Sequence, residues 1–132
     1  MKALKANVTR AIPIGAMLEC ADNTGAKKLG LIAVKGYHGR KSRLQSACVG
    51  DVVVCSVKKG NKKWRKLVVK ALIIRQKKEY RRSDGMRIKF EDNAAVIVND
   101  KIEPQGSQIK GPVAREITSR FLSIAKISSF VV

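Results

Sequence analysis

Three stretches of the sequence place an aromatic side chain among lysine and arginine residues. Tyr37, Trp64 and Tyr80 each fall within such a stretch, whereas the phenylalanines lie in apolar surroundings. Cationic side chains neutralise phosphates and release their condensed counterions, and aromatic rings stack on unpaired bases. These residue types in this arrangement predict contact with an irregular nucleic acid, held through its backbone and its splayed bases.

The candidate contact residues share a cationic or aromatic side chain, and most of them belong to the three basic stretches. They are Lys28, Lys35, Tyr37, Arg40, Lys41, Arg43, Lys59, Lys62, Lys63, Trp64, Arg65, Lys66, Arg75, Lys77, Arg81, Arg82, Lys110 and Arg115. His38 is the one histidine of the chain. It lies in the first basic stretch, where we expect it to neighbour a phosphate rather than to act as a general base.

The aromatic residues of the basic stretches allow a second interpretation. Trp64 and Tyr80 would also suit the inner face of a β-ribbon, covered by the alkyl stems of lysine and arginine. Both interpretations stay open for these two residues, and Tyr37 is left without a role.

Catalytic signatures are missing from the sequence. No serine or cysteine can be matched with His38 by a sequence argument. The segment Gly106–Gly111 imitates a phosphate-binding loop, but a proline and a valine follow where lysine and serine or threonine are required. Asp84, Glu91 and Asp92 resemble nuclease carboxylates for Mg²⁺, although turn formation explains them better. We therefore expect no enzyme, no cofactor and no metal site.

The charge balance is the strongest bulk signal. There are 28 lysine and arginine residues against 10 aspartate and glutamate residues, a formal net charge of +18. A small soluble domain usually carries a net charge of about 2 to 8 in magnitude, so the excess indicates a polyanionic partner. Two rival classes remain, a free nucleic-acid chaperone or chromatin-like DNA binder, and a nuclease or RNA-modifying enzyme.

Length and hydropathy predict one folded domain that spans residues 1–132. Hydrophobic residues make up 45% of the chain, enough for a core. No run approaches the ~18 apolar residues that span a bilayer, and the N-terminus has no block typical of a signal peptide. We expect a cytoplasmic protein without a membrane partner.

The three cysteines predict structure rather than chemistry. Cys20, Cys48 and Cys55 form no C-x-x-C motif, and one histidine is too few for a Cys/His zinc finger. Each lies beside apolar residues, so we expect small buried thiols in a reducing compartment rather than a disulfide or a reactive nucleophile.

Short apolar, β-branched runs dominate the secondary-structure signal. The expected strands are Met17–Ala21, Leu29–Val34, Val52–Val57, Leu67–Ile74, Met86–Phe90 and Ala94–Val98. Turn residues separate them at 23–25, 60–61, 84–85 and 99–100. This spacing predicts a small closed sheet or barrel, and a paired ribbon projecting from it with the basic side chains along it would follow phosphates.

The end of the chain changes to a helical period. Val113, Ile117, Phe121 and Ile124 recur at helical spacing after Pro112, which suits the first position of a helix. We expect one or two short helices over about residues 112–126. The apolar tail, 127–132, is expected to pack on its own domain, with docking on a partner as the alternative.

Four groups of residues then resemble a known family. They are Ala21–Ala26, Val49–Asp51, the set Ala71–Ile74 with Asp84, Gly85, Phe90, Asn93, Val96 and Ile97, and Lys110–Glu116. In these the chain resembles the universal large-subunit ribosomal protein family numbered fourteen, from about Gly15 to Ile124. The loop Lys35–Tyr37 and the longer N-terminal lead are similar to its archaeal and eukaryotic branch. Ser83, where proline is common, and the tail from Phe121 depart from the family pattern.

The resemblance implies a mainly β fold, a five-stranded β-barrel with a projecting β-ribbon and one or two short C-terminal helices. It implies a structural constituent of the large ribosomal subunit, ribosome-bound, with large-subunit ribosomal RNA and neighbouring large-subunit proteins as partners. It further implies a place near the subunit interface, contact with small-subunit RNA in an intersubunit bridge, and a share in the docking site of the anti-association initiation factor six. No small-molecule substrate is implied.

Overall fold

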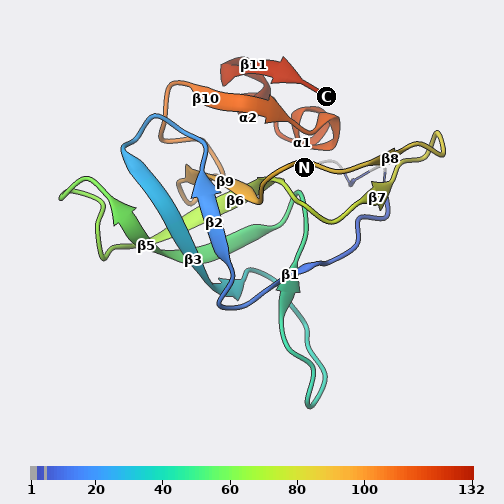
Figure 1. Cartoon of the computed structure of the whole chain (residues 1–132), viewed down its shortest axis with the longest axis horizontal. Helices are drawn as coiled ribbons and strands as arrows, with labels where there is room; N and C mark the ends of the chain where they lie inside the picture. The colour runs from blue at the N-terminus through green and yellow to red at the C-terminus, as the bar shows by residue number, and fades with distance from the viewer. Residues whose placement is uncertain (1–2, 5) are drawn as a thin grey trace.

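Five strands close into a barrel in a computed structural model that describes residues 3–4 and 6–132 (Figure 1). They are β2 (Met17–Cys20), β3 (Ala26–Val34), β5 (Val52–Gly60), β6 (Val68–Arg75) and β9 (Ala94–Val98). Neighbours pair antiparallel from β2 through β3, β5 and β6 to β9, and β9 then pairs parallel with β2 to complete the circle. The predicted closed five-stranded barrel is confirmed.

The side-chain pattern explains why these segments form a closed barrel. In β5, Val53, Cys55 and Val57 are buried, and the residues between them are half-buried, as period-two alternation requires. All five residues of β9 are buried, which suits a continuous apolar run. Each Leu, Ile or Val taken fully out of water contributes about 1.5–3 kcal/mol.

Three two-stranded sheets surround the barrel. Strand β1 (Ile12–Pro13) pairs antiparallel with β4 (Ser46–Ala47), β7 (Tyr80–Arg81) pairs antiparallel with β8 (Arg87–Ile88), and β10 (Ile109–Val113) pairs parallel with β11 (Ser128–Val131). The expected strand Met86–Phe90 is thus reduced to the short β8, the second strand of the ribbon.

Two short helices, α1 (Arg115–Arg120) and α2 (Leu122–Ile127), confirm the predicted helical end of the chain. The prediction that Pro112 opens the first helix is wrong. Pro112 lies in β10 opposite Phe130 of β11, and the main-chain N–H of Val132 donates to the carbonyl oxygen of Val113 at 2.9 Å. Pairing with the tail keeps this segment extended, so the helix begins only at Arg115.

The tail packs on its own chain as predicted, through the main chain of β11. Its side chains stay largely outside, with Phe130 62% exposed and Val131 45% exposed. In Figure 1 the pair β10 and β11 lies with both helices above the barrel.

The three basic stretches occupy three separate projections rather than one ribbon (Figure 1). The loop 35–45 joins β3 to β4. The hairpin 58–67 consists of the end of β5 and the turn that leads to β6. The excursion 76–93 between β6 and β9 carries the ribbon of β7 and β8. No helix within the described residues is long and apolar enough to cross a membrane.

Candidate nucleic-acid interface

The loop 35–45 presents its cations to solvent. Lys35, Arg40, Lys41 and Arg43 are all exposed. Tyr37 is half-buried, and its hydroxyl donates to the carbonyl oxygen of Leu44 at 3.4 Å. Tyr37, a candidate contact whose role the sequence left open, is thus linked to the end of the loop and remains a candidate.

Arg10 joins this loop although no sequence pattern links the two. Its guanidinium carbon lies 5.9 Å from the centroid of the Tyr37 ring, a cation–π distance. The side chain is exposed, so it adds a cation to the loop surface. Arg10 and Tyr37 are too far apart in the sequence for any local pattern to have revealed this neighbour.

The hairpin 58–67 carries the densest group of cations. Its exposed members are Lys58, Lys59, Lys62, Lys63, Arg65 and Lys66. The tip is a defined turn, because the N–H groups of Trp64 and Arg65 both donate to the carbonyl oxygen of Asn61 at 3.0 Å. Trp64 is half-buried against the edge of the core, so both interpretations of its ring remain compatible with its position.

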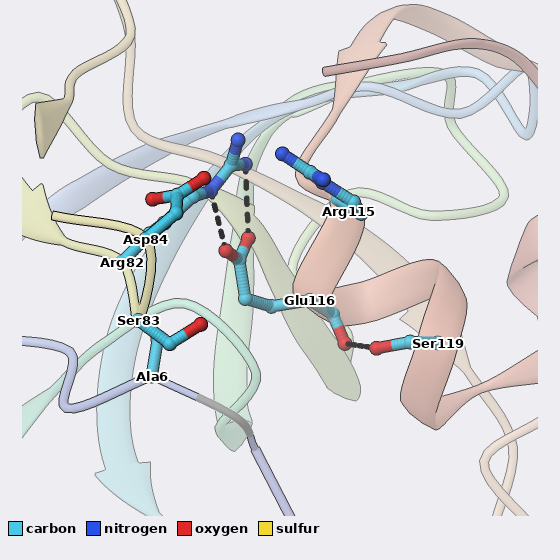
Figure 2. A pocket seen from close by; sticks show the side chains of 7 residues that line it. All are labelled: Ala6, Arg82, Ser83, Asp84, Arg115, Glu116 and Ser119. Carbon is cyan, nitrogen blue, oxygen red and sulfur yellow. Dashed lines mark hydrogen bonds and ion pairs between the residues drawn. The ribbon is translucent and has the colours of Figure 1, made fainter. Parts of the chain in front are cut away.

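Arg82 was predicted to contact RNA, and the structure assigns its side chain elsewhere. It is 8% exposed. Its Nε donates to Glu116 Oε1 at 2.6 Å, and its Nη2 donates to Glu116 Oε2 at 3.2 Å and to the main-chain oxygen of Val132 at 2.7 Å. The guanidinium thus joins the β7–β8 ribbon, helix α1 and the tail, and it is no longer a candidate contact. Figure 2 shows Arg82 beside Glu116.

Arg75 was also predicted to contact RNA, but its side chain is buried. It is 7% exposed and makes a bidentate pair with Asp92, Nε to Oδ1 at 2.8 Å and Nη2 to Oδ2 at 2.9 Å. Its Nη1 donates to the carbonyl oxygens of Lys110 and Pro112 at 3.1 and 2.8 Å. This side chain ties β6 to β10 and is not available to a phosphate.

Tyr80 is buried, which decides between its two interpretations. Its ring is 1% exposed, and its hydroxyl donates to Glu116 Oε2 at 2.9 Å. Burial raises the pKa of this phenol, and the Glu116 carboxylate raises it further. Tyr80 therefore holds the ribbon to the body of the protein, and it stacks on no base.

Glu116 is the acceptor that organises this network. Burial alone would raise the pKa of its carboxyl, but hydrogen bonds from Arg82, its own main chain and Tyr80 outweigh burial and leave that pKa lowered. Glu116 is consequently an anion at neutral pH, and it neutralises Arg82 in place.

A pocket of about 240 Å³ lies beside the network, with Arg82, Ser83, Asp84, Arg115 and Glu116 in its wall (Figure 2). Two cations and two carboxylates balance each other there, so the pocket has no excess charge for an anion. Exposed Arg115 remains a candidate contact at its mouth.

The other predicted residues stay accessible. Lys77, Arg81 and Lys110 are exposed. Lys28 is exposed too and lies 3.6 Å from Glu19 on the neighbouring strand, an exposed pair that holds it only weakly.

The motif around Asp22 holds the fold together. Asp22 is 3% exposed, and its carboxylate accepts the N–H of Thr24 at 3.1 Å and the N–H of Ile97 at 2.8 Å. Asn23 Oδ1 accepts the N–H of Ser107 at 3.0 Å. These bonds close the turn after β2 and tie it to β9 and to the segment before β10.

The three thiols are free, and Cys48 and Cys55 are buried while Cys20 is half-buried. Burial raises the pKa of each to about 12, and the carboxylates of Asp22 and Asp51 add to the effect at Cys20 and Cys48. The predicted burial of Cys48 and Cys55 is confirmed, whereas Cys20 is less buried than predicted. Protonated, enclosed thiols are poor nucleophiles. No cluster of metal-ligating side chains occurs within the described residues.

Comparison with known proteins identifies the family. Residues 11–132 match the family described as Ribosomal protein L14p/L23e. The chain is 55% identical over 132 residues to a large ribosomal subunit protein uL14 of Methanothrix thermoacetophila, covering all of both chains. It is 54% identical over 131 residues to the uL14 protein of Methanococcus vannielii, with 99% of each chain covered, and 52% identical over 132 residues to that of Halorubrum lacusprofundi, with all of each covered.

These matches confirm the resemblance drawn from the motifs. The relatives are named as ribosomal proteins rather than enzymes, and a protein of the large subunit has ribosomal RNA and ribosomal proteins as its surroundings. The chain belongs to the Ribosomal protein L14p/L23e family of large-subunit ribosomal proteins.

Proposed function

We propose that this protein binds large-subunit ribosomal RNA as a rigid wedge, with its three basic projections neutralising phosphates where RNA helices converge. The barrel supplies the rigidity, and exposed lysine and arginine side chains supply the charge. Specificity then comes from RNA shape more than from base edges, because A-form grooves present little readable sequence.

The observation that carries the proposal is that the exposed cations of two projections, the loop 35–45 and the hairpin 58–67, form no ion pair within the described part of the chain. Five ion pairs form among the described residues, and none of them includes a cation of the loop 35–45 or of the hairpin 58–67. With a net charge of +18, such unpaired cations favour a polyanion that releases counterions on binding.

Family membership supports a finer proposal. The protein lies near the subunit interface, contacts small-subunit RNA in an intersubunit bridge, and contributes to the docking site of the anti-association initiation factor six. Its location is ribosome-bound in the cytoplasm. The exposed side chains of Phe130 and Val131 give a protein partner an apolar surface to cover.

Sucrose-gradient fractionation of cells expressing the tagged chain tests the proposal. Stoichiometric retention on the large-subunit peak after a high-salt wash is the expected result. The combined substitutions Lys62→Gln, Lys63→Gln and Arg65→Gln should lower the salt concentration at which the chain is released. The matched control replaces by glutamine three exposed cations that lie outside the three projections, Lys27, Lys101 and Lys126.

Recovery of the wild-type chain mainly in light fractions would contradict the proposal and favour a free nucleic-acid chaperone.

A further inference from the structure

The β7–β8 ribbon turns one face toward the body of the protein. Tyr80 and Arg82 point inward, 1% and 8% exposed, and both donate to the carboxylate of Glu116. Ile88, the partner of Tyr80 across the ribbon, is half-buried against the core. Side chains alternate between the two faces of a strand, so the neighbouring residues of β7 and β8 face away from the protein.

Arg81 and Arg87 occupy this outward face as a directly opposed pair. They are register partners of β7 and β8, and both are exposed. Directly opposed residues of an antiparallel pair carry their side chains on one face, with Cβ atoms about 4.5–5.5 Å apart. Arg87 lies outside the contacts predicted from the sequence, because the register that brings it beside Arg81 is not visible there.

Two like charges in these positions destabilise a free ribbon. Among the described residues, the one carboxylate paired with either arginine is that of Glu79, whose Oε1 lies 3.4 Å from Arg87 Nη1, and both side chains are exposed. An exposed pair of this kind neutralises its cation only weakly. The outward face therefore keeps an excess of positive charge that a bound anion would relieve.

The outward face is also held in a fixed position. The ribbon has two register pairs, too few to be stable alone, and the bonds of Tyr80 and Arg82 to Glu116 supply support from the body of the protein. At the tip, the N–H of Arg82 donates to the carbonyl oxygen of Met86 at 2.8 Å, and the N–H of Gly85 donates to that of Arg82 at 3.0 Å. A preorganised backbone loses little freedom on binding.

A phosphate is the anion that suits two opposed guanidinium groups. Each guanidinium presents N–H donors in a planar fork that matches the oxygens of a phosphate, and one anion between the two cations relieves their repulsion. We infer that Arg81 and Arg87 together hold one phosphate of large-subunit ribosomal RNA. The inference rests on the proposed function and adds Arg87 to its contacts.

The affinity of the whole chain for deproteinised large-subunit ribosomal RNA, measured by filter binding over a range of salt concentrations, tests the inference. The variants are Arg81→Gln, Arg87→Gln and the two combined. The control is Lys126→Gln, at an exposed cation of helix α2 outside the ribbon. Each single arginine variant should bind about tenfold more weakly, the loss expected for one hydrogen bond between charged groups, and the control should bind like the wild type.

Sharing of one phosphate makes the two losses non-additive. The double variant should bind about as weakly as either single variant, well short of the roughly hundredfold loss that two independent contacts would give. The slope of log affinity against log salt should become shallower by roughly one, the share of a single phosphate, rather than by two.

Unchanged binding of either single variant would overturn the inference, and so would a loss that Lys126→Gln reproduces. Losses that multiply in the double variant, with a slope change of about two, would assign the arginines to separate phosphates and overturn the shared site.

Urea denaturation of the free variants separates an RNA contact from a structural role. Because removing either charge relieves repulsion, Arg81→Gln and Arg87→Gln should unfold at the same urea concentration as the wild type or at a higher one. A marked loss of stability would assign the arginines to the fold instead and overturn the inference. Failure of the wild-type chain to bind the RNA would be a different result, because it refutes the proposed function itself and the inference with it.

Discussion

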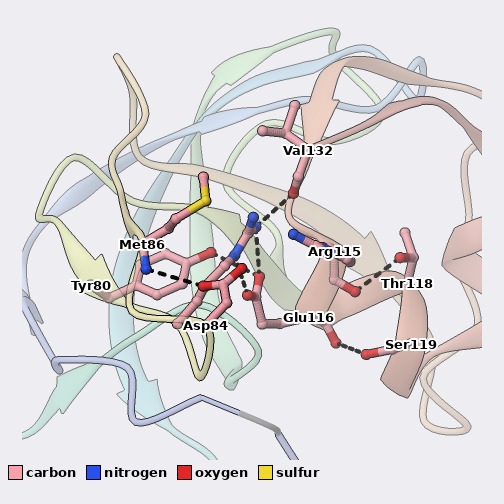
Figure 3. A network of polar contacts seen from close by, with 9 residues as sticks. Tyr80, Asp84, Met86, Arg115, Glu116, Thr118, Ser119 and Val132 are labelled. Carbon is pink, nitrogen blue, oxygen red and sulfur yellow. Dashed lines mark hydrogen bonds and ion pairs between the residues drawn. The ribbon is translucent and has the colours of Figure 1, made fainter.

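Arg82 of the β7–β8 ribbon and Glu116 of helix α1 form a buried ion pair, with Arg82 Nε 2.6 Å from Glu116 Oε1 and each side chain 7% exposed. The two residues are 34 positions apart in the chain. The same guanidinium reaches the main-chain oxygen of Val132. The Arg82–Glu116 pair is therefore one contact that joins the basic ribbon, helix α1 and the C-terminal tail; Figure 3 labels Tyr80, Glu116 and Val132 around it.

Removing one partner of this pair should be costly. Glu116→Gln leaves the buried Arg82 guanidinium without its counter-charge, and the free energy of unfolding should fall by about 3 to 5 kcal/mol. Urea denaturation measures this change. Arg81→Gln removes one charge, of the opposite sign, from the exposed residue next to Arg82 and should change stability by no more than about 0.5 kcal/mol. Equal effects of the two variants would show that the pair contributes nothing specific.

The pair should also give stability a particular dependence on pH. The folded pKa of Glu116 lies below its ordinary value of 4.5, so the unfolded chain binds the proton first as the pH falls. The stability from this group is complete above the ordinary pKa and is lost as the pH falls through the folded pKa. Denaturation of the wild type and of Glu116→Gln at several pH values should give free energies that converge below pH 4.5. Parallel curves would contradict this assignment.

Any substitution of Arg75 that removes the planar guanidinium should destabilise the fold. Arg75→Lys keeps the charge but cannot make the bidentate pair with Asp92 and also reach two carbonyl oxygens, so unfolding should become easier by about 1 to 3 kcal/mol. Thermal or urea denaturation checks this value. Lys77→Gln, on an exposed side chain two residues away, is the control, and a destabilisation of the same size there would refute the role of Arg75.

The buried thiols should be unreactive in the folded protein. Burial raises the pKa of Cys48 and Cys55 to about 12, so almost no thiolate exists near pH 8. Alkylation by iodoacetamide, followed by mass spectrometry, should be roughly tenfold slower or more without denaturant than with it. Rapid alkylation of both residues in the folded state would show that the barrel opens readily.

The barrel was predictable from sequence because its signal is local. Alternation in β5 and the apolar run of β9 are visible within a few residues, and the turn residues mark where each strand ends. The burial and ion pairing of Arg75 and Arg82 were not predictable, because their partners Asp92 and Glu116 lie 17 and 34 positions away. An arginine in a basic stretch looks the same whether it meets solvent or a buried carboxylate.

Pro112 and Tyr80 show the same limit. The apolar residues after Pro112 do have helical spacing, and a helix forms from Arg115. The main chain at Pro112 instead pairs with β11. Tyr80 could not be assigned until its partner, Glu116, was known. Local patterns predicted the elements and the sign of the surface charge, whereas contacts between distant segments decided which basic residues remain free.

The salt dependence of RNA binding tests the central claim most directly. Affinity of the chain for a large-subunit ribosomal RNA fragment would be measured over a range of salt concentrations. The triple variant Lys62→Gln, Lys63→Gln and Arg65→Gln is compared with the triple control, glutamine at Lys27, Lys101 and Lys126. The slope of log affinity against log salt should become shallower by roughly one for each phosphate that the hairpin variant no longer neutralises. Equal slopes for the wild type, the hairpin variant and the control would contradict a phosphate-binding role for the hairpin.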